Sequence, residues 1–116
     1  MKKILIIDDE ESIVDIASYL LKEKGFIVET TLNKNILSTF ETFLPDLALI
    51  DIRIKGEADG KDLCKTLKEK HIFIALLFSA YPNLEKIYRT CDADGFIEKP
   101  FDINELVNIV EGYLLN

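Results

Sequence analysis

The residues that could carry out a reaction lie in four short pieces of this chain, each at or just past the end of an apolar run. Asp8-Asp9 lie near the start and Asp51 lies in the middle, while Ser79 follows a fourth apolar run and Lys99-Pro100 follows a fifth. Three neighbouring carboxylates repel one another unless a cation lies among them. A hydroxyl and an ammonium group beside them suit an anion. The combination is typical of a site that binds a divalent metal and accepts a phosphoryl group on a carboxylate.

Short apolar runs that alternate with segments of helical period must position these residues. We expect strands at residues 3–7, 26–30, 47–50, 72–78 and 96–98. We expect helices at residues 12–24, 61–70 and 83–91, a second helix that Asn33 caps and Pro45-Asp46 stops, and a fifth helix that Asp102 caps. Helical spacing places many apolar side chains on the buried faces of these helices, among them Ile16, Leu37, Leu44 and Tyr113.

Five strands that alternate with five helices predict an α/β fold with a parallel sheet. The order 2-1-3-4-5, doubly wound and flavodoxin-like, places a switch point between the first and third strands, and ligands bind beyond the carboxyl ends of the strands there. Asp8-Asp9 follow the first strand and Asp51 follows the third. The acids and the switch point therefore coincide.

The bulk composition limits the function classes. The 116 residues suit a single domain, residues 1–116, and 48% of them are hydrophobic. A net charge of −7 argues against nonspecific nucleic-acid binding, and no apolar run is long enough for a membrane span. Cys64 and Cys91 form no metal or redox spacing, so we expect two reduced, mostly buried thiols in a cytoplasmic protein.

Each candidate residue also has a structural interpretation. Asp8 and Asp9 could cap the first helix, and Asp51 could cap a loop. With Asp51 opposite the pair, a metal site is favoured, and few hard oxygen ligands indicate Mg²⁺, although Mn²⁺ would fit them too. As a nucleophile, Asp51 would form an acyl phosphate. Lys99 could then neutralise a phosphoryl oxygen, Ser79 could donate a hydrogen bond to it, and Pro100 can hold a cis peptide.

The chain resembles the receiver (response-regulator) domains of two-component signalling over essentially its whole length. The matching motifs are Ile-Leu-Ile-Ile-Asp8-Asp9-Glu, Pro45-Asp46-Leu-Ala-Leu-Ile-Asp51, Phe78-Ser79-Ala80 and Gly95-Phe96-Ile97-Glu98-Lys99-Pro100-Phe101. The resemblance implies that Asp51 is the phosphoacceptor, and that Asp8, Asp9 and Asp51 bind the metal together with the backbone carbonyl of Arg53. It implies that Ser79 is the switch hydroxyl, Phe96 the rotating aromatic residue and Lys99 the phosphate-contacting lysine.

The sequence departs from the family pattern beside the site. Lys55 stands where the family usually has a proline, and the loop to Asp59-Gly60 is about one residue longer than usual. Phe96 stands where a tyrosine is common, and the fourth helix is short because Pro82 precedes it closely. The first two departures bear on the conformation of the loop and the lifetime of the phosphoryl group.

The resemblance implies a switch without enzyme turnover of its own. A histidine kinase or a phosphotransfer protein would supply the phosphoryl group, and the face made by the fourth helix, fifth strand and fifth helix would change shape. The target would be a downstream protein or an attached output domain, and the same face, with Ile109 on its outer side, could join two copies in a homodimer. Neither a membrane nor direct nucleic-acid binding by this domain is expected.

Three alternatives belong to other classes. A degenerate receiver would act only as a protein-binding module. An Asp-nucleophile phosphatase would need a second acid two residues after Asp51, where this chain has Arg53. A flavodoxin-like cofactor binder would need a phosphate-binding loop after the first strand, where acids would repel a phosphate. His71 is expected at a helix end, away from the acids, and not as a phosphohistidine donor.

Overall fold

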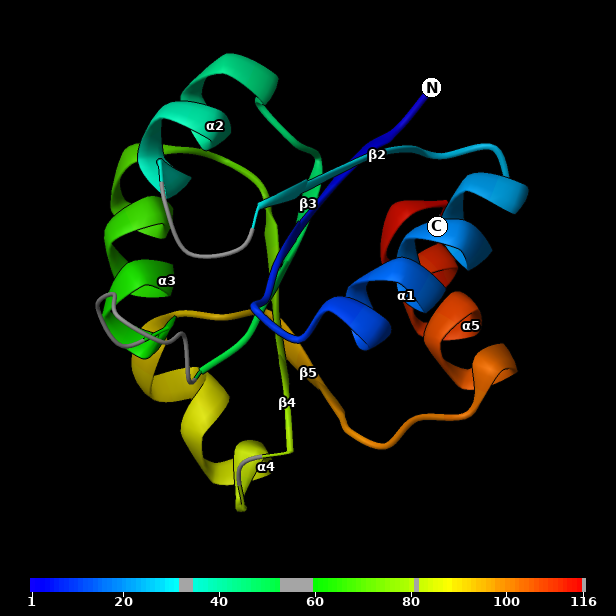
Figure 1. Ribbon diagram of the computed structural model, residues 1–116. Helices are drawn as coiled ribbons and strands as arrows, with labels where there is room; N and C mark the ends of the chain where they lie inside the picture. The colour runs from blue at the N-terminus through cyan, green and yellow to red at the C-terminus, as the bar shows by residue number, and fades with distance from the viewer. Residues whose placement is uncertain (32–34, 53–59, 81, 116) are drawn as a thin grey trace.

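The computed structural model describes residues 1–31, 35–52, 60–80 and 82–115 (Figure 1). The strands are β1 (Lys3–Ile7), β2 (Ile27–Thr31), β3 (Leu47–Ile50), β4 (Ile74–Ser79) and β5 (Gly95–Glu98). The helices are α1 (Glu11–Glu23), α2 (Ile36–Phe43), α3 (Gly60–Lys70), α4 (Leu84–Ile87), the 3₁₀ helix η1 (Tyr88–Cys91) and α5 (Ile103–Leu114). None of the helices in these ranges is long and apolar enough to cross a membrane.

All strand pairs are parallel, and the sheet order is β2-β1-β3-β4-β5, which confirms the predicted topology. The register brings the carboxyl ends of the strands level with one another. Ile7 pairs with Ile50, and Ser79 pairs with Glu98. The residue that follows each of these strand ends therefore lies at one edge of the sheet.

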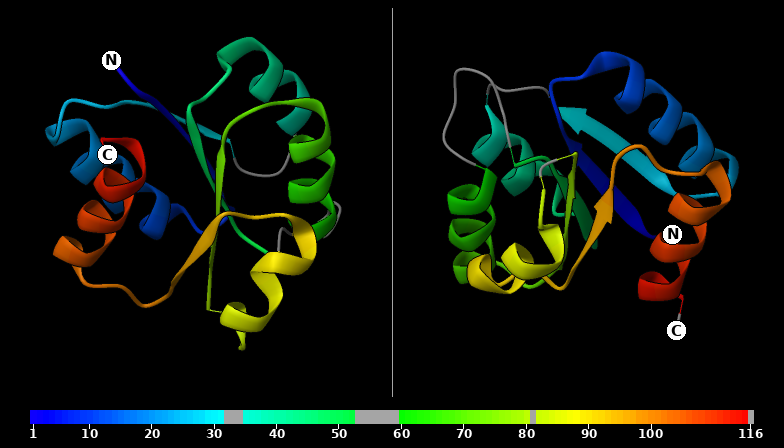
Figure 2. Two further views of the ribbon diagram at one scale, coloured as in Figure 1. Left: turned by 180° about the vertical axis from the view of Figure 1, so that it is seen from behind. Right: turned by 90° about the horizontal axis from the view of Figure 1, so that it is seen from below.

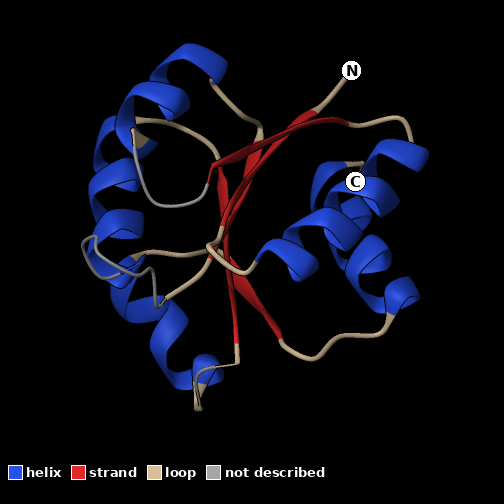
Figure 3. Ribbon diagram, viewed as in Figure 1, coloured by secondary structure: helices blue, strands red, loops and turns tan. Residues whose placement is uncertain are grey.

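Two helical layers cover the two faces of the sheet, as Figures 2 and 3 show from three directions. Helices α1 and α5 lie on one face, where Val14, Leu21 and Leu106 pack against one set of strand side chains. Helices α2, α3 and α4 lie on the other face, where Phe40 and Leu67 pack against the alternate set. Both faces of the central strands are buried, which explains why β3 is apolar throughout and why β1 and β4 are apolar except for Lys3 and Ser79 at their ends.

The two cysteines are free thiols and both are buried, as the sequence predicted. Cys64 belongs to α3 and Cys91 to η1, and they lie in the same apolar cluster. A hydrogen bond shared with the Cys91 side chain, together with burial, raises the pKa of Cys64. Cys64 therefore stays a neutral thiol and contributes to packing.

Four apolar side chains that helical spacing placed inward are exposed: Ile16, Leu37, Leu44 and Tyr113. The buried positions of α1 are Val14, Ala17 and Leu21, so its apolar face is narrower than the sequence pattern suggested. Leu44 lies past the end of α2 in a left-handed conformation, with φ of 51°. The Tyr113 hydroxyl donates a hydrogen bond to the carbonyl of Asp94, and this bond lies at the exposed surface.

The structure also moves several expected boundaries. Strand β4 begins at Ile74 and not at the expected Ile72, which is fully exposed. Strand β2 runs from Ile27 to Thr31, one residue later than expected. The fourth helix is short, as expected, and its last turn tightens into η1. Asp102 caps α5, since its carboxylate accepts a hydrogen bond from the Asn104 backbone N–H at 2.8 Å. Asn33, the expected cap of the second helix, lies outside the described residues.

Candidate functional site

Three carboxylates meet beyond the ends of β1 and β3. Asp8 and Asp51 follow the paired residues Ile7 and Ile50, and both carboxylate residues are buried. One carboxylate oxygen from each of Asp8, Asp9 and Asp51 lies within 4.8 Å of the others. Buried carboxylates at this spacing require a positive counter-charge, and a small set of hard oxygen ligands suits Mg²⁺, which retains several waters.

Backbone hydrogen bonds fix these acids, because the pairing of the sheet continues one residue past each strand. The Asp51 N–H donates to the carbonyl of Ile7 at 2.9 Å, and the Asp8 N–H donates to the carbonyl of Thr31 at 3.2 Å. The Glu10 N–H donates to Oδ1 of Asp8 at 2.9 Å. Both positions therefore follow from strand register and not from loop conformation.

Lys99 supplies a positive charge among the acids. Its Nζ lies 2.5 Å from Oδ2 of Asp8 and 3.9 Å from Oδ2 of Asp51. The Lys99 side chain is only 7% exposed, and its ammonium group lies 4.9 Å from the centre of the Phe78 ring. Its backbone N–H donates to the carbonyl of Ser79 at 3.0 Å, and the Lys99–Pro100 peptide bond is cis. The ammonium group thus reaches Asp8 and Asp51 from the far edge of the sheet.

A small cavity opens beside Asp51 with a volume of about 250 Å³. Carboxylate, hydroxyl, ammonium and small apolar groups line it: Asp9, Glu10, Asp51, Ser79, Ala80, Pro82 and Lys99. Ser79 is buried at the end of β4. A tetrahedral group attached to Asp51 would therefore meet carboxylates, a hydroxyl and an ammonium group on the walls of one cavity.

Gly60 packs against the backbone at the end of β3. Its N–H donates to the carbonyl of Ile52 at 2.8 Å. A Cβ at this position would lie 1.9 Å from the carbonyl oxygen of Asp51 and 2.7 Å from Cα of Ile52. Only a hydrogen atom fits between the start of α3 and Asp51, so the contact with Gly60 restricts where the Asp51 backbone lies.

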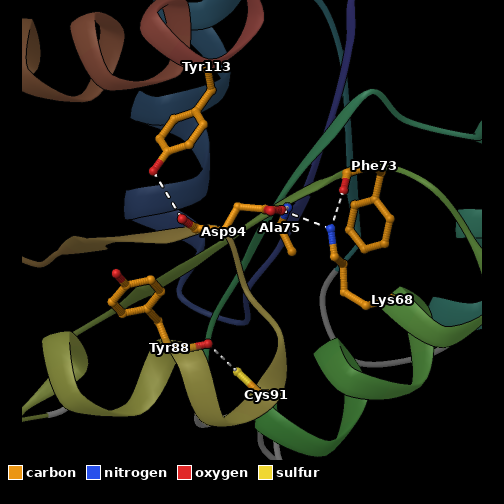
Figure 4. A network of polar contacts seen from close by, with 7 residues as sticks. All are labelled: Lys68, Phe73, Ala75, Tyr88, Cys91, Asp94 and Tyr113. Atoms are coloured by element: carbon orange, nitrogen blue, oxygen red, sulfur yellow. Dashed lines mark hydrogen bonds and ion pairs between the residues drawn. The ribbon is translucent and has the colours of Figure 1, made fainter.

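A second group of polar contacts holds the beginning of β5, at the other end of the strand from Lys99 (Figure 4). The Asp94 carboxylate accepts hydrogen bonds from the Ala75 N–H at 2.8 Å and from Nζ of Lys68 at 2.9 Å. The Asp94 N–H donates to the carbonyl of Ala75 at 2.8 Å, and the Tyr113 hydroxyl donates to the carbonyl of Asp94 at 3.2 Å. These bonds join α3, β4 and α5 at one residue.

Phe96 lies in β5 between this anchor and Lys99. It is partly buried, and its ring centre lies 5.2 Å from that of Tyr88 in η1. A hollow of about 380 Å³ borders it on the side of α5, where Asn108, Ile109 and Tyr113 contribute to the lining. Residues of η1, β5 and α5 therefore share one partly apolar surface.

The sequence model of the response regulator receiver domain family matches residues 4–111. The chain belongs to this family. Among relatives of known sequence, the receiver domain is 34% identical over 109 residues to the alkaline phosphatase synthesis transcriptional regulatory protein PhoP of Bacillus subtilis (strain 168). That match covers 90% of this chain and 45% of PhoP, so the chain spans less than half the length of this relative.

Solved structures agree with this assignment. The receiver domain of NtrX from Brucella abortus superposes with a TM-score of 0.88 at 29% identity, over 97% of this chain and 98% of that one. A two-component response regulator from Clostridium difficile reaches a TM-score of 0.92 at 22% identity, over 100% of this chain and 98% of that one. The second likeness concerns the fold alone, which is the flavodoxin-like receiver fold predicted from the sequence.

The structure brings Asp8, Asp9, Asp51 and Lys99 together, with Ser79 on the wall of the same cavity. The remaining expected metal ligand, the carbonyl of Arg53, lies outside the described residues, and so do the departures at Lys55 and Asp59. Sequence reasoning gave no role to Glu10, Phe78 or Gly60. Glu10 continues the acidic run that starts at Asp8, which is a usable signal, whereas the close approach of Gly60 is visible only in three dimensions.

His71 lies where the sequence placed it, directly after α3. Its ring centre lies 4.8 Å from that of Phe40, and Nε2 is buried without a hydrogen-bond partner among the described residues. Phe40 belongs to α2, on the face of the sheet that α3 also covers. The imidazole is therefore packed as an aromatic ring and is not part of the acid cluster.

Proposed function

We propose that this receiver domain, residues 1–116, accepts a phosphoryl group from a phosphohistidine onto Asp51 and acts as a two-state signalling switch. One observation carries the proposal. Lys99 bridges Asp8 and Asp51 at the point where three carboxylate oxygens lie within 4.8 Å of one another. Asp9, Asp51 and Lys99 also line a cavity of about 250 Å³, which supports roles for them as metal ligand, nucleophile and phosphate-binding cation.

In the transfer step, an Asp51 carboxylate oxygen attacks phosphorus in line with the phosphorus–nitrogen bond of the donor. The new oxygen–phosphorus bond forms as the phosphorus–nitrogen bond breaks. The donor imidazole carries a proton on its other ring nitrogen, so the nitrogen that keeps the electron pair leaves as part of a neutral imidazole. The products are an aspartyl phosphate and free histidine. Catalysis of such a step consists mainly of positioning and charge neutralisation.

The metal would be held by Asp8, Asp9 and Asp51, with the Arg53 carbonyl as a further ligand. When bound there, Mg²⁺ or Mn²⁺ would supply positive charge that neutralises the phosphoryl oxygens. Lys99 would move its ammonium group from Asp8 toward the phosphoryl group, a short movement because it already lies 3.9 Å from Asp51. Ser79 would donate its hydroxyl to a phosphoryl oxygen.

The switch would follow from the movement of Ser79. As its hydroxyl turns to the phosphoryl group, Phe96 would rotate inward from its partly buried position against Tyr88. The surface of α4, β5 and α5 would then change shape. Phosphorylation would bias a pre-existing equilibrium between the two states, as ligands do in other two-state proteins.

The partners follow from this chemistry. A sensor histidine kinase or a phosphotransfer protein would donate the phosphoryl group. The output would be a downstream protein or an attached domain, since the PhoP relative is named as a transcriptional regulatory protein and is about twice as long as the matched region. A homodimer through α4, β5 and α5 is a further arrangement that the same surface would permit.

The decisive experiment is incubation with acetyl phosphate and Mg²⁺, followed by intact mass measurement of the wild type and of Asp51→Asn. We expect an adduct in the wild type alone, and none when EDTA is added beforehand. An adduct of equal yield in Asp51→Asn would contradict the assignment of the acceptor. A folded wild type that gives no adduct with any phosphodonor would instead favour a receiver that acts only as a binding module.

A further inference from the structure

Glu10 lies on the wall of the cavity beside Asp51, and its side chain takes no part in capping α1. It occupies the N-cap position of α1, but its side chain makes no capping hydrogen bond. Glu10 contributes to helix capping only through its carbonyl, which accepts from the N–H groups of Ile13 and Val14 at 3.0 and 3.1 Å. Short side chains such as Ser, Thr, Asp and Asn are the ones that cap helices well.

The Glu10 side chain turns toward the site instead. Its Oε1 lies 3.5 Å from Nζ of Lys99, and the residue lines the cavity beside Asp51. The Glu10 side chain is 58% exposed, whereas that of Lys99 is 7% exposed. Glu10 therefore places a fixed negative charge on the rim of the cavity through which a phosphodonor reaches Asp51.

The geometry points to Glu10 as a positioning residue that selects phosphodonors by charge: it slows phosphoryl transfer from small dianionic donors while it strengthens Mg²⁺ binding. This inference rests on the proposed phosphorylation of Asp51. Glu10 competes for Lys99, the cation that must approach the incoming phosphoryl group. It also adds a negative potential that an anion meets on entering the cavity and that a divalent cation finds favourable.

Loss of the Glu10 charge should change the transfer rate and the Mg²⁺ affinity in opposite directions. This opposition distinguishes an electrostatic effect from general damage to the fold. Replacing the carboxylate by an amide of the same shape removes the charge and leaves the backbone capping bonds in place. The anionic donor should then react faster and the metal should bind more weakly. A substitution that merely disturbed the site would lower both the rate of transfer and the affinity for Mg²⁺.

The test compares Glu10→Gln with the wild type in transfer from acetyl phosphate at saturating Mg²⁺, at low and at high salt. We expect Glu10→Gln to react about two- to fivefold faster at low salt, the size of the effect of an exposed ion pair. The ratio should fall toward one at high salt, where counter-ions screen exposed charges. The ratio of the Glu10→Gln rate to the wild-type rate should also be smaller with phosphoramidate, because this donor carries less net negative charge than acetyl phosphate. Calorimetric titration should show Mg²⁺ binding weakened by about two- to fivefold.

Glu11→Gln is the matched control, because it removes an equal charge one residue away in the exposed first turn of α1. Glu11→Gln should change the rate of transfer from acetyl phosphate and the affinity for Mg²⁺ less than Glu10→Gln does. Equal rates for Glu10→Gln and wild type, a ratio independent of salt, or a parallel loss of rate and Mg²⁺ affinity would each overturn the inference while leaving phosphorylation of Asp51 intact. Absence of any adduct in all variants would overturn the proposed function and this inference together.

Discussion

Lys99 is a residue with two competing sets of contacts. Its ammonium group is almost fully buried and lies closer to Asp8 than to Asp51. A buried charge without a partner is strongly destabilising, so each of these groups depends on the other. A metal ion bound by the same carboxylates would compete with the ammonium group for them, which makes Lys99 both a stabilising counter-ion and an opponent of metal binding.

Replacing Lys99 by Gln should therefore separate its two roles. We expect the affinity for Mg²⁺ to rise by about tenfold, since three carboxylates lose their built-in cation. The rate of phosphoryl transfer should fall by about 10²-fold, the usual effect of removing one group that stabilises transition-state charge. Calorimetry and intact mass kinetics measure the two quantities. Lys68→Gln is the control, because Lys68 pairs with Asp94 at the other end of β5, and an equal rise in its Mg²⁺ affinity would refute the argument.

At the scale of elements, the start of α3 and the end of β3 form one unit. Gly60 approaches the Asp51 carbonyl so closely that no side chain fits, and its N–H bonds to Ile52. The helix can therefore lie where it does only if the Asp51 backbone keeps its position. This contact connects the packing of α3 with the direction of the Asp51 carboxylate.

Gly60→Ala should destabilise the receiver domain by about 1–3 kcal/mol, the range for overpacking a tight contact. It should also slow adduct formation at Asp51. Gly112→Ala, within α5, places its Cβ in open space and should stabilise the domain by about 0.4–1 kcal/mol. Urea denaturation measures both changes. If Gly60→Ala were as stable as the wild type, the close approach described for Gly60 would be wrong.

The elements also show what could be predicted from the sequence and what could not. Strand Leu47–Ile50 is apolar throughout, and Lys3–Ile7 is apolar after its first residue. Their alternation with helices indicates a parallel sheet, so the meeting of Asp8 and Asp51 was predictable. Exposed apolar side chains were not. Ile16 has helical spacing yet lies outside the narrow buried stripe of α1, and Tyr113 is exposed because its hydroxyl binds a carbonyl in another element. The sequence pattern shows which side chains are apolar, whereas burial depends on whether another element packs against that side chain in the fold.

At the scale of the whole molecule, the sheet has two unlike halves. Strands β1 and β3 lie inside the sheet and are buried on both faces, while β5 is an edge strand that pairs only with β4. Lys99 follows the edge strand, and Phe96 lies within it. The half that contains β4, β5, α4 and α5 can therefore rearrange without breaking the pairing of β1 with β3.

Hydrogen–deuterium exchange should reveal this division when the receiver domain is phosphorylated on Asp51. We expect altered exchange in residues 84–98 and 103–114 and little change in residues 27–31 and 36–43, because only the first group packs around Ser79 and Phe96. The unphosphorylated Asp51→Asn variant under the same conditions is the control. A uniform change over all peptides, or a change confined to β2 and α2, would contradict the proposed path of the switch.

The hydrogen bonds at Asp94 have a mechanical consequence for β5. The amino end of the strand is tied to α3, β4 and α5 at one residue, whereas its carboxyl end carries Lys99 beside the cavity. The strand also pairs with β4 along its length, and the Lys99 N–H bonds to the Ser79 carbonyl, so β5 can move only together with the end of β4. We therefore expect a pull on Lys99 to displace the carboxyl ends of both strands, and the displacement decreases toward Asp94. Phe96, which lies partway along the strand, would move less than Lys99 does and in the same direction.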